Sequence, residues 1–273
     1  MLQILSRRLQ SRSKERELEK LAEVLNRTFD RLQEAFEKQR RFIADASHEL
    51  RTPVSAILAQ MELARRKDRT AAEYREAIES SHSAAKRLRD IVDGLLTLAR
   101  SNADGLPLEV GEVDLGEIVG ECLDLVEPLA AEKTVTIHRE LADIGIEGDP
   151  LRLAQVVTNL ATNAIRYNRP GGEVRVSLRE DGTNAVLTVA DSGLGIPPEA
   201  IPCVFDRFFR VDPARSSREG GIGLGLAIAK AIVDAHGGTI GCTSEADRGS
   251  TCTVRLPRRH PDRRPGTRGG TPA

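Results

Sequence analysis

The sequence predicts a multidomain protein in which an all-α helical hairpin precedes an α+β domain. The first observation is that the segment from residue 13 to Pro53 contains no glycine or proline before that proline. The second is that its apolar residues recur at steps of three and four, the spacing of helices that pack along a seam. The third is that helical and strand patterns mix after residue 114, without a regular strand–helix–strand repeat.

The hairpin is predicted from two helices, over residues 13–66 and 71–101. Thr70 has the spacing of an N-cap to Glu73, which favours a turn before the second helix. A lone hairpin cannot cover both apolar seams, whereas two copies form a four-helix bundle, so we expect a homodimer. The seams comprise Ile43, Ser47, Leu50, Val54, Ile57, Met61 and Ala64 in the first helix, and Ile78, Ser81, Ala85, Leu88, Val92, Leu95 and Ala99 in the second.

The α+β domain is predicted as a layer of helices on one mixed sheet. Asp149-Pro150 is a typical helix start, Asp181-Gly182 is a favoured hairpin turn, and Gly237-Gly238 is a typical helix end. Residues 101–114 are predicted to be a linker, and the Pro-, Gly- and Arg-rich residues 258–273 a disordered tail. The predicted helices are 115–130, 151–167 and 224–236, and the predicted strands are 134–138, 144–148, 173–179, 185–190, 239–243 and 250–256.

The composition fits a globular protein and excludes several other classes. Hydrophobic residues make up 40% and charged residues 30%, enough for a core. No stretch approaches the ~20 apolar residues of a membrane-spanning helix, and no signal peptide is visible. The four cysteines are far apart in sequence without a C-x-x-C motif, which favours reduced, mostly buried thiols of a cytosolic protein over disulfides or zinc.

The charge is unevenly distributed along the chain. Residues 1–42 carry 11 basic and 7 acidic side chains, whereas residues 43–256 carry 24 basic and 33 acidic ones. An acidic body is not typical of a nucleic-acid-binding protein, so we expect no nucleic-acid partner. Two interpretations are open for the basic N-terminus, a solvated helix face or proximity to an anionic membrane surface.

His48 is a candidate nucleophile, in the segment F-I-A-D-A-S-H-E-L-R-T-P. It flanks the seam on the solvent side, and Glu49 beside it can accept the proton of one ring nitrogen and leave the other to attack. Pro53 predicts a bend just below His48 because it removes one helical hydrogen bond. A zinc peptidase needs a second histidine four residues after the first, where this chain has Thr52.

Three segments of the second domain are candidates for nucleotide chemistry. In the segment 159–168, amides and a cation on one helix face suit a metal–phosphate complex, and a plain polar face is the alternative. In D-S-G-L-G-I-P, residues 191–197, an acidic acceptor is followed by glycines that let the backbone approach a flat ring. In G-G-I-G-L-G-L-A-I, residues 220–228, glycines open a helix and leave N–H groups for phosphate. None of them is a Walker loop, which requires G-K-[ST]. The Rossmann fingerprint is also absent, because Gly221, Gly223 and Gly225 run G-x-G-x-G and no strand leads directly into them.

These segments, in this order, closely resemble the cytoplasmic catalytic part of bacterial two-component sensor histidine kinases. The segment around His48 resembles the H box, residues 159–168 the N box, and residues 191–196 the G1 box. F-D-R-F-F-R, residues 205–210, resembles the F box, and G-G-I-G-L-G-L the G2 box. Residues 18–32 resemble the end of a HAMP module. The resemblance covers about residues 15–256 and implies a dimeric four-helix bundle followed by an α+β sandwich of the Bergerat fold that binds ATP.

The resemblance also implies a role for each matching residue. His48 would accept the γ-phosphoryl group of ATP, with Glu49 as its base, and the phosphoryl group would pass to an aspartate of a response regulator receiver domain. Asn163 would ligate Mg²⁺. A lid over about residues 192–220 would close on the nucleotide. The implied nucleotide-binding residues are Asn159, Asn163, Arg166, Tyr167, Asp191, Gly193, Gly195, Arg210, Gly221, Gly223 and Gly225.

The chain departs from the family pattern at two positions. Ile222 replaces a usual Thr or Ser, which implies the loss of one hydroxyl contact to phosphate, and Asn168 replaces a usual Ser or Thr. We expect neither departure to remove an essential role. Two roles are open for Thr52: positioning a water for dephosphorylation of the regulator, or a backbone hydrogen bond that shapes the bend. Competing hypotheses are a regulator-binding module without kinase activity and a mechanical ATPase of the same fold.

The resemblance implies four regions along the chain. They are a signalling helix over 1–38, a dimerisation and phosphotransfer domain over 39–104, a catalytic ATP-binding domain over 105–257, and the tail. The family usually carries a sensor and membrane helices upstream, so we expect membrane contact only through such a region. The expected location is the cytoplasm, at the inner membrane if the chain is part of a membrane sensor. His82, His138, His236 and His260 lack motif context and are interpreted as structural or surface residues.

Overall fold

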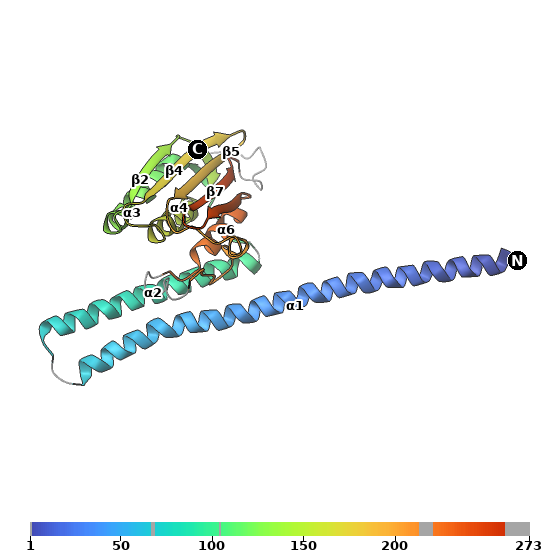
Figure 1. The fold of residues 1–273 in the computed structure, drawn as a ribbon, viewed down its shortest axis with the longest axis horizontal. Helices are drawn as coiled ribbons and strands as arrows, with labels where there is room; N and C mark the ends of the chain where they lie inside the picture. The colour runs from blue at the N-terminus through green and yellow to red at the C-terminus, as the bar shows by residue number, and fades with distance from the viewer. Residues whose placement is uncertain (1, 67–68, 104, 213–220, 260–273) are drawn as a thin grey trace, which may run out of the picture. The chain divides into compact units, whose positions relative to one another are not determined.

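The computed structural model describes residues 2–66, 69–103, 105–212 and 221–259. The chain divides into two compact units, Met1–Arg51 and Thr52–Ala273. The long helix α1 (Leu2–Arg65) begins earlier than predicted and continues through Pro53 (Figure 1). Within the described ranges, none of the helices combines the length and the apolar character needed to cross a membrane.

The second helix, α2 (Ala71–Ala103), begins at the predicted capping box. The Glu73 carboxylate accepts a hydrogen bond from the Thr70 backbone N–H at 2.8 Å, and the Thr70 hydroxyl accepts one from the Glu73 N–H at 3.3 Å. This reciprocal arrangement satisfies two backbone donors that a helix start otherwise leaves without partners. The prediction of the second helix and its start is confirmed.

The main sheet has five strands in the order β2-β4-β5-β7-β6. Only β2 and β4 pair in parallel, and the other neighbours are antiparallel, which confirms a mixed sheet. Figure 1 shows the strands as one twisted layer with the helices below it. The strands are β2 (Thr136–Leu141), β4 (Glu173–Asp181), β5 (Asn184–Asp191), β6 (Thr239–Glu245) and β7 (Gly249–Pro257).

Three helices pack on this sheet and enclose the core: α3 (Leu115–Glu132), α4 (Pro150–Arg166) and α6 (Gly225–Ala235). Their inward faces are aliphatic, and burial of each such side chain contributes about 1.5–3 kcal/mol relative to exposure. A short 3-10 helix, η1 (Ile201–Cys203), lies in the connection between β5 and α6. Side chains buried to 2% exposure or less include Val119, Leu123, Leu153, Val157, Ile165, Val174, Leu187, Ile232 and Val254.

Asp149 and His236 lock the starting end of α4 to the far end of α6. The Asp149 carboxylate accepts hydrogen bonds from the backbone N–H groups of Leu151 and Arg152, as expected of an N-cap. Its own N–H donates to Nε2 of buried His236 at 3.0 Å. This contact confirms the structural interpretation of His236.

Two predictions are wrong at the start of the α+β domain: the linker does not extend to residue 114, and the domain has a second sheet. Residues 111–114 form a strand, β1 (Gly111–Asp114), which pairs antiparallel with β3 (Gly145–Gly148) in a separate two-stranded sheet. Asp114 ends β1 and also caps α3, accepting a hydrogen bond from Gly116 N–H at 2.7 Å. A four-residue strand that runs directly into a helix has too few residues to show a two-residue period.

The C-terminal boundary also differs from the prediction. Arg258 continues the ordered backbone beyond β7, since its N–H donates to the Thr183 carbonyl at 3.0 Å and its carbonyl accepts from the Glu147 N–H at 2.9 Å. The rest of the predicted tail, residues 260–273, lies outside the described residues, as does the segment 213–220 of the predicted lid.

One face of α2 packs on the α+β domain, which the seam pattern did not predict. Ile91 is fully buried and Leu98 is 2% exposed. A Cβ at Gly94 between them would lie 3.1 Å from side-chain atoms of Leu224 and Ile228 in and next to α6. The spacing of 91, 94 and 98 repeats the steps of three and four on a second face of the helix.

Candidate functional site

A cavity of about 420 Å³ lies between α4, the sheet face of β5–β7 and the chain that follows β5. Five of the predicted nucleotide-binding residues line it, although they come from three separate sequence motifs: Asn163, Tyr167, Asp191, Gly195 and Arg210. The other lining side chains are mostly aliphatic, among them Leu160, Val189, Leu194, Ile196 and Leu226. A pocket with apolar walls and a few convergent polar groups is the usual form of a small-molecule site.

Asp191 is the carboxylate of this cavity. It ends β5, and its Oδ1 accepts hydrogen bonds from the N–H of Gly193 at 2.9 Å and of Ser250 at 3.3 Å. Burial raises the pKa of Asp191 above its ordinary value, and the two backbone hydrogen bonds oppose this effect. The carboxylate is therefore fixed in direction, as an acceptor that recognises an amino group must be.

Two glycines shape the chain beside Asp191. A Cβ at Gly193 would lie 2.4 Å from the Tyr167 carbonyl oxygen. Gly195 has φ +67° and a Cβ there would lie 2.0 Å from the Glu245 carbonyl oxygen. Only glycine fits at these two positions without a shift of the backbone. Gly193 supports the loop without lining the cavity, and Gly195 does both.

Asn168, one of the two departures from the family pattern, has a structural role. Its amide donates a hydrogen bond to the Glu173 carbonyl at 2.9 Å, and its Oδ1 accepts one from the Arg169 N–H at 2.9 Å. The side chain thus closes the turn between α4 and β4. These hydrogen bonds fix the chain just after α4, the helix that contains Asn163 and is followed by Tyr167.

Asn159 does not line the cavity, contrary to a direct reading of its motif. Its Nδ2 donates to the Gly225 carbonyl at 3.1 Å and so ties α4 to the first residue of α6. It lines a different hollow of about 660 Å³, together with Arg100 and Thr158. Asn159 and Asn163 share a helix, but one amide faces α6 and the other the cavity.

Gly223, in the glycine segment before α6, lies next to the F box segment rather than in the cavity. The Gly223 carbonyl accepts a hydrogen bond from the Phe208 N–H at 2.9 Å, and a Cβ at Gly223, which has φ +78°, would lie 2.8 Å from Phe208. In the described residues no side chain caps the start of α6, so its N–H groups stay available. Arg166, Gly221, Gly223 and Gly225 are absent from the cavity lining.

The candidate nucleophile, His48, lies on α1 in the first of the two units. His48 and Thr52 are both exposed and lie one helical turn apart, and Glu49 is half-buried. Pro53 is buried. The exposure of His48 agrees with the access that an attacking ring nitrogen needs.

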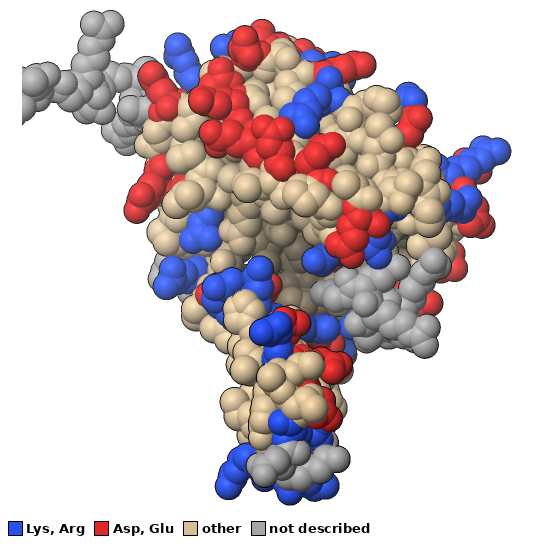
Figure 2. All heavy atoms as spheres, turned by 90° about the vertical axis from the view of Figure 1, so that its left-hand side faces the viewer, with Lys and Arg blue, Asp and Glu red and all other residues tan. Residues whose placement is uncertain are grey.

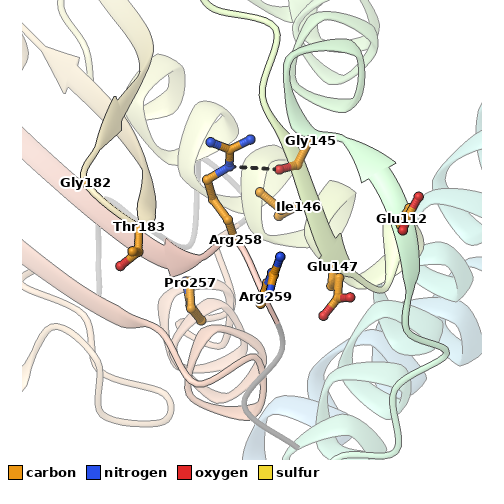
Figure 3. A pocket seen from close by; sticks show the side chains of 9 residues that line it. All are labelled: Glu112, Gly145, Ile146, Glu147, Gly182, Thr183, Pro257, Arg258 and Arg259. Carbon is orange, nitrogen blue, oxygen red and sulfur yellow. Dashed lines mark hydrogen bonds between the residues drawn. The ribbon is translucent and has the colours of Figure 1, made fainter. Parts of the chain in front are cut away.

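A larger cavity, of about 730 Å³, contains none of the predicted site residues. Figure 3 shows it between β3, the turn after β4 and the end of β7. Arg258 crosses it, donating from Nε to the Gly145 carbonyl at 3.2 Å and pairing with Glu180 at 2.9 Å. These contacts attach the end of the main sheet to β3. The residues around this cavity therefore have a structural role.

Sequence reasoning missed two residues that line the cavity of about 420 Å³, Cys242 and Cys252. They are ten residues apart in sequence and no motif links them. Only the register of β6 with β7 places them opposite each other. The sequence signal that predicts such a pair is the alternation of the two strands about the turn between them.

Charged side chains and possible metal ligands can be located on the α+β domain. Figure 2 shows acidic side chains gathered over the uppermost part of the α+β domain in that view. Among the described residues, no group of three or more His, Cys, Asp or Glu side chains is placed to hold a metal ion. An amide oxygen such as that of Asn163, together with ligand oxygens, is a donor set that suits Mg²⁺.

Two family models match the chain. The His Kinase A phospho-acceptor domain matches residues 38–104, and the domain of histidine kinase-, DNA gyrase B- and HSP90-like ATPases matches residues 148–260. The sensor histidine kinase CusS of Escherichia coli O157:H7 is 36% identical over 243 residues, which is 89% of this chain and 50% of CusS. The chain thus spans about half the length of the curated relatives it matches.

Solved structures agree with these matches. The histidine kinase ThkA in complex with the response regulator protein TrrA has a TM-score of 0.65 and 25% identity, over 82% of this chain and 63% of that one. Full-length ShkA in complex with AMPPNP has a TM-score of 0.61 and 29% identity, over 77% of this chain and 44% of that one. With both domain models in order and His48, Asn163 and Asp191 in their motifs, the chain belongs to the sensor histidine kinases of two-component systems.

Proposed function

We propose that this chain is an ATP-dependent protein-histidine kinase that phosphorylates its own His48 and then donates the phosphoryl group to an aspartate of a response regulator. The observation that carries the proposal is the meeting of Asn163, Tyr167 and Asp191 in one cavity of about 420 Å³. The two domain matches and the kinase relatives support it.

In the nucleotide site, the Asp191 carboxylate accepts a hydrogen bond from the adenine amino group. Its hydrogen bonds to Gly193 and Ser250 hold it in place before the ligand arrives. The Tyr167 ring covers the adenine, and Gly195 lets the backbone approach the base. Arg166 and Arg210 offer charge to the phosphates, and the N–H groups at the glycine segment Gly221, Gly223 and Gly225 receive phosphate oxygens.

Mg²⁺, when bound, supplies charge neutralisation of the phosphates. Asn163 would hold it through its side-chain oxygen, and Asn159 would support the site by anchoring α6 to α4. Magnesium keeps most of its waters, so one protein oxygen beside phosphate oxygens suffices.

The transfer step joins a ring nitrogen of His48 to the γ-phosphorus of ATP. The bond between that phosphorus and the bridging oxygen to the β-phosphate breaks, and ADP leaves. Glu49 takes the proton of the other ring nitrogen and so leaves the attacking one with its lone pair. Positioning and charge supply most of the rate, as in phosphoryl transfer generally. The phosphoramidate then passes its phosphoryl group to the aspartate of a receiver domain.

The partners we propose are a second copy of the chain and a receiver domain. Several predicted seam residues are well exposed in the single chain, among them Ile43, Val54, Met61, Ile78 and Val92. Exposed large apolar side chains at helical spacing favour a four-helix bundle. The complex of ThkA with TrrA supports a regulator as the second partner.

We also propose a division of the chain into four regions, 1–38, 39–104, 105–257 and 258–273. The last boundary is moved to follow Arg258, because the backbone of Arg258 is hydrogen-bonded to the catalytic domain. We also propose that the chain acts in the cytoplasm, where ATP and response regulators occur, and meets the membrane only through an upstream region. No nucleic-acid partner is proposed for the acidic body.

A second activity is proposed for Thr52, dephosphorylation of the regulator. Thr52 is exposed one turn beyond His48 in α1, and we propose that its hydroxyl positions a water beside an aspartyl-phosphate docked next to His48. Thr52→Ala should slow the decay of a phosphorylated regulator and spare autophosphorylation. A parallel loss of autophosphorylation would instead favour the structural role of Thr52 in the helix before Pro53.

The nucleotide site is tested by titration with a fluorescent ATP analogue, with Mg²⁺ and with EDTA. Asn163→Ala should lose the metal-dependent part of the affinity because the ion loses its protein ligand. Asn184→Ala, at the start of β5 outside the cavity lining, serves as the matched control. If EDTA lowers the affinity of Asn163→Ala as much as it lowers that of the wild type, Asn163 is not the protein ligand of Mg²⁺.

A further inference from the structure

Two free thiols face each other across neighbouring strands of the nucleotide cavity. Cys242 of β6 pairs directly with Cys252 of β7 in antiparallel register. The Cys252 thiol donates a hydrogen bond to Cys242, with their Sγ atoms 3.0 Å apart. Residues opposed in this way have Cα atoms roughly 4.5–5.5 Å apart, within the ~4.4–6.8 Å span of disulfide bonds.

The pair belongs to the wall of the cavity and is linked to other groups there. Ser250, two residues before Cys252 on the same strand face, donates its N–H to Asp191 at 3.3 Å. Ser244, two residues after Cys242, accepts a hydrogen bond at its Oγ from the Ile196 N–H at 2.8 Å. A shift of either cysteine is therefore passed to the carboxylate and to the loop after it.

We propose that Cys242 and Cys252 form a modification site, at which a small-molecule disulfide of the glutathione class is exchanged for an intramolecular Cys242–Cys252 disulfide that weakens nucleotide binding. The inference that the disulfide forms depends on the strand geometry alone. The inference that it lowers the affinity for nucleotide rests on the proposed function of the cavity. In the described residues no third His, Cys, Asp or Glu side chain joins the pair as a metal ligand, which favours bond formation between the sulfurs.

The exchange balances without another oxidant. The Cys242 thiolate attacks one sulfur of the small disulfide, forms a mixed disulfide and releases one thiolate. Cys252 then attacks the Cys242 sulfur, its proton passes to the departing thiolate, and a second thiol leaves. The protein loses two hydrogens and the small disulfide gains them. The hydrogen bond from Cys252 lowers the pKa of Cys242, while the same contact and burial raise the pKa of Cys252, so Cys242 attacks first.

Affinity falls because the bond draws the two strands together at this point. The sulfurs move from 3.0 Å apart to about 2.05 Å. Because β7 lies between β5 and β6, movement of β7 toward β6 lengthens the contact from Ser250 to Asp191, which is already 3.3 Å. The carboxylate then loses part of the support that fixes its direction.

The disulfide itself is tested on the full chain with oxidised glutathione, thiol counting and peptide mapping without reduction. The wild type should fall from four free thiols to two, with a Cys242–Cys252 crosslink that a reducing dithiol reverses. Cys252→Ser should stop at a mixed disulfide on Cys242, and Cys242→Ser should react more slowly. Cys203→Ser, the matched control for a half-buried cysteine elsewhere, should still form the crosslink. Four remaining thiols, or a crosslink through Cys203, would overturn the site.

The coupling is tested by titrating reduced and crosslinked protein with a fluorescent ATP analogue. The crosslink should weaken binding about tenfold, equal to about 1.4 kcal/mol, and saturating nucleotide should slow crosslink formation. Equal affinities of the two forms would overturn the coupling, even with the crosslink in place. Reduced protein that binds no ATP analogue would instead refute the proposed function, and the peptide map would still report on the disulfide.

Discussion

At the residue scale, Asp191 shows how a small number of backbone contacts prepare a carboxylate for recognition. Burial favours its protonated form, and hydrogen bonds from Gly193 and Ser250 favour the charged form. The net effect is a raised pKa, so the fold binds this proton more tightly than the unfolded chain does. Asp191 therefore favours the folded state more at low pH than at neutral pH, and acid does not unfold the domain through this group.

Nucleotide affinity should fall as the pH is lowered through the raised pKa of Asp191, because the charged carboxylate accepts a stronger hydrogen bond from an amino group than the protonated acid does. Asp191→Asn should bind weakly at all pH values and lose this acid-range dependence. Binding of an ATP analogue between pH 4 and 7 measures it, with Asp234→Asn on the exposed side of α6 as the control. The same acid dependence in Asp191→Asn would show that another group titrates.

Gly195→Ala should destabilise the domain by about 1–3 kcal/mol, because it combines a strained φ with a collision at the Glu245 carbonyl. Two control glycines separate these effects. Gly182→Ala has φ +62° with open space around it, and Gly241→Ala has open space without a positive φ. Urea unfolding should rank the losses Gly195, Gly182, Gly241, and equal losses at all three positions would contradict the close packing inferred at Gly195.

Part of the site could be predicted from the sequence, residue by residue. Asn163, Tyr167 and Asp191 lie in short motifs, so their types and order were visible, and the structure brings them into one cavity. The amide of Asn159 is used between helices instead, which its motif alone does not reveal. Cys242 and Cys252 meet only through strand register, and register depends on pairing between strands rather than on either local pattern.

At the element scale, α2 has two different apolar faces. The predicted seam face includes Ile78, which is 67% exposed, and the other face includes Leu98, which is 2% exposed and belongs to the core of the α+β domain. Both follow steps of three and four residues. The sequence predicted the helix correctly, and the pairing of the seam face with a second copy stays a prediction. A single pattern does not say which partner each face meets.

Leu98→Ala should lower the free energy of unfolding by about 2–5 kcal/mol, because it leaves a cavity in the core that α2 shares with the α+β domain. Leu96→Ala, at a half-exposed position of the same helix, should change it by less than about 0.5 kcal/mol. Urea unfolding at one protein concentration compares them. Similar losses in the two variants would contradict the packing of α2 on the α+β domain.

The strands illustrate why some elements were predicted and others not. The β4–β5 hairpin was visible because its strands alternate and its turn holds Asp181-Gly182, with Gly182 at φ +62°. Strand β1 was missed because its four residues lead directly into the N-cap of α3. The type of a long regular element can be predicted from its own sequence pattern. The formation of a short element depends on pairing with a segment distant in the chain.

At the scale of the whole molecule, the exposed apolar side chains of the hairpin predict self-association. Val92→Asp should weaken the dimer by at least ~2 kcal/mol, or about 30-fold, because the bundle would bury an unpaired charge. Leu125→Asp, at a position 77% exposed on α3, should leave the association unchanged. Sedimentation over a concentration series measures both, and a monomeric wild type at active concentrations would contradict the bundle.

The central claim is that His48 receives the γ-phosphoryl group of ATP, and labelling of the purified chain tests it most directly. With γ-labelled ATP and Mg²⁺, the wild type should acquire a label that acid removes and base does not, as expected of a phosphoramidate. His48→Gln should bind the ATP analogue as the wild type does and take up no label. His82→Gln, at an exposed position of α2, should be labelled normally. Label that persists on His48→Gln, or an acid-stable label on the wild type, would contradict the account.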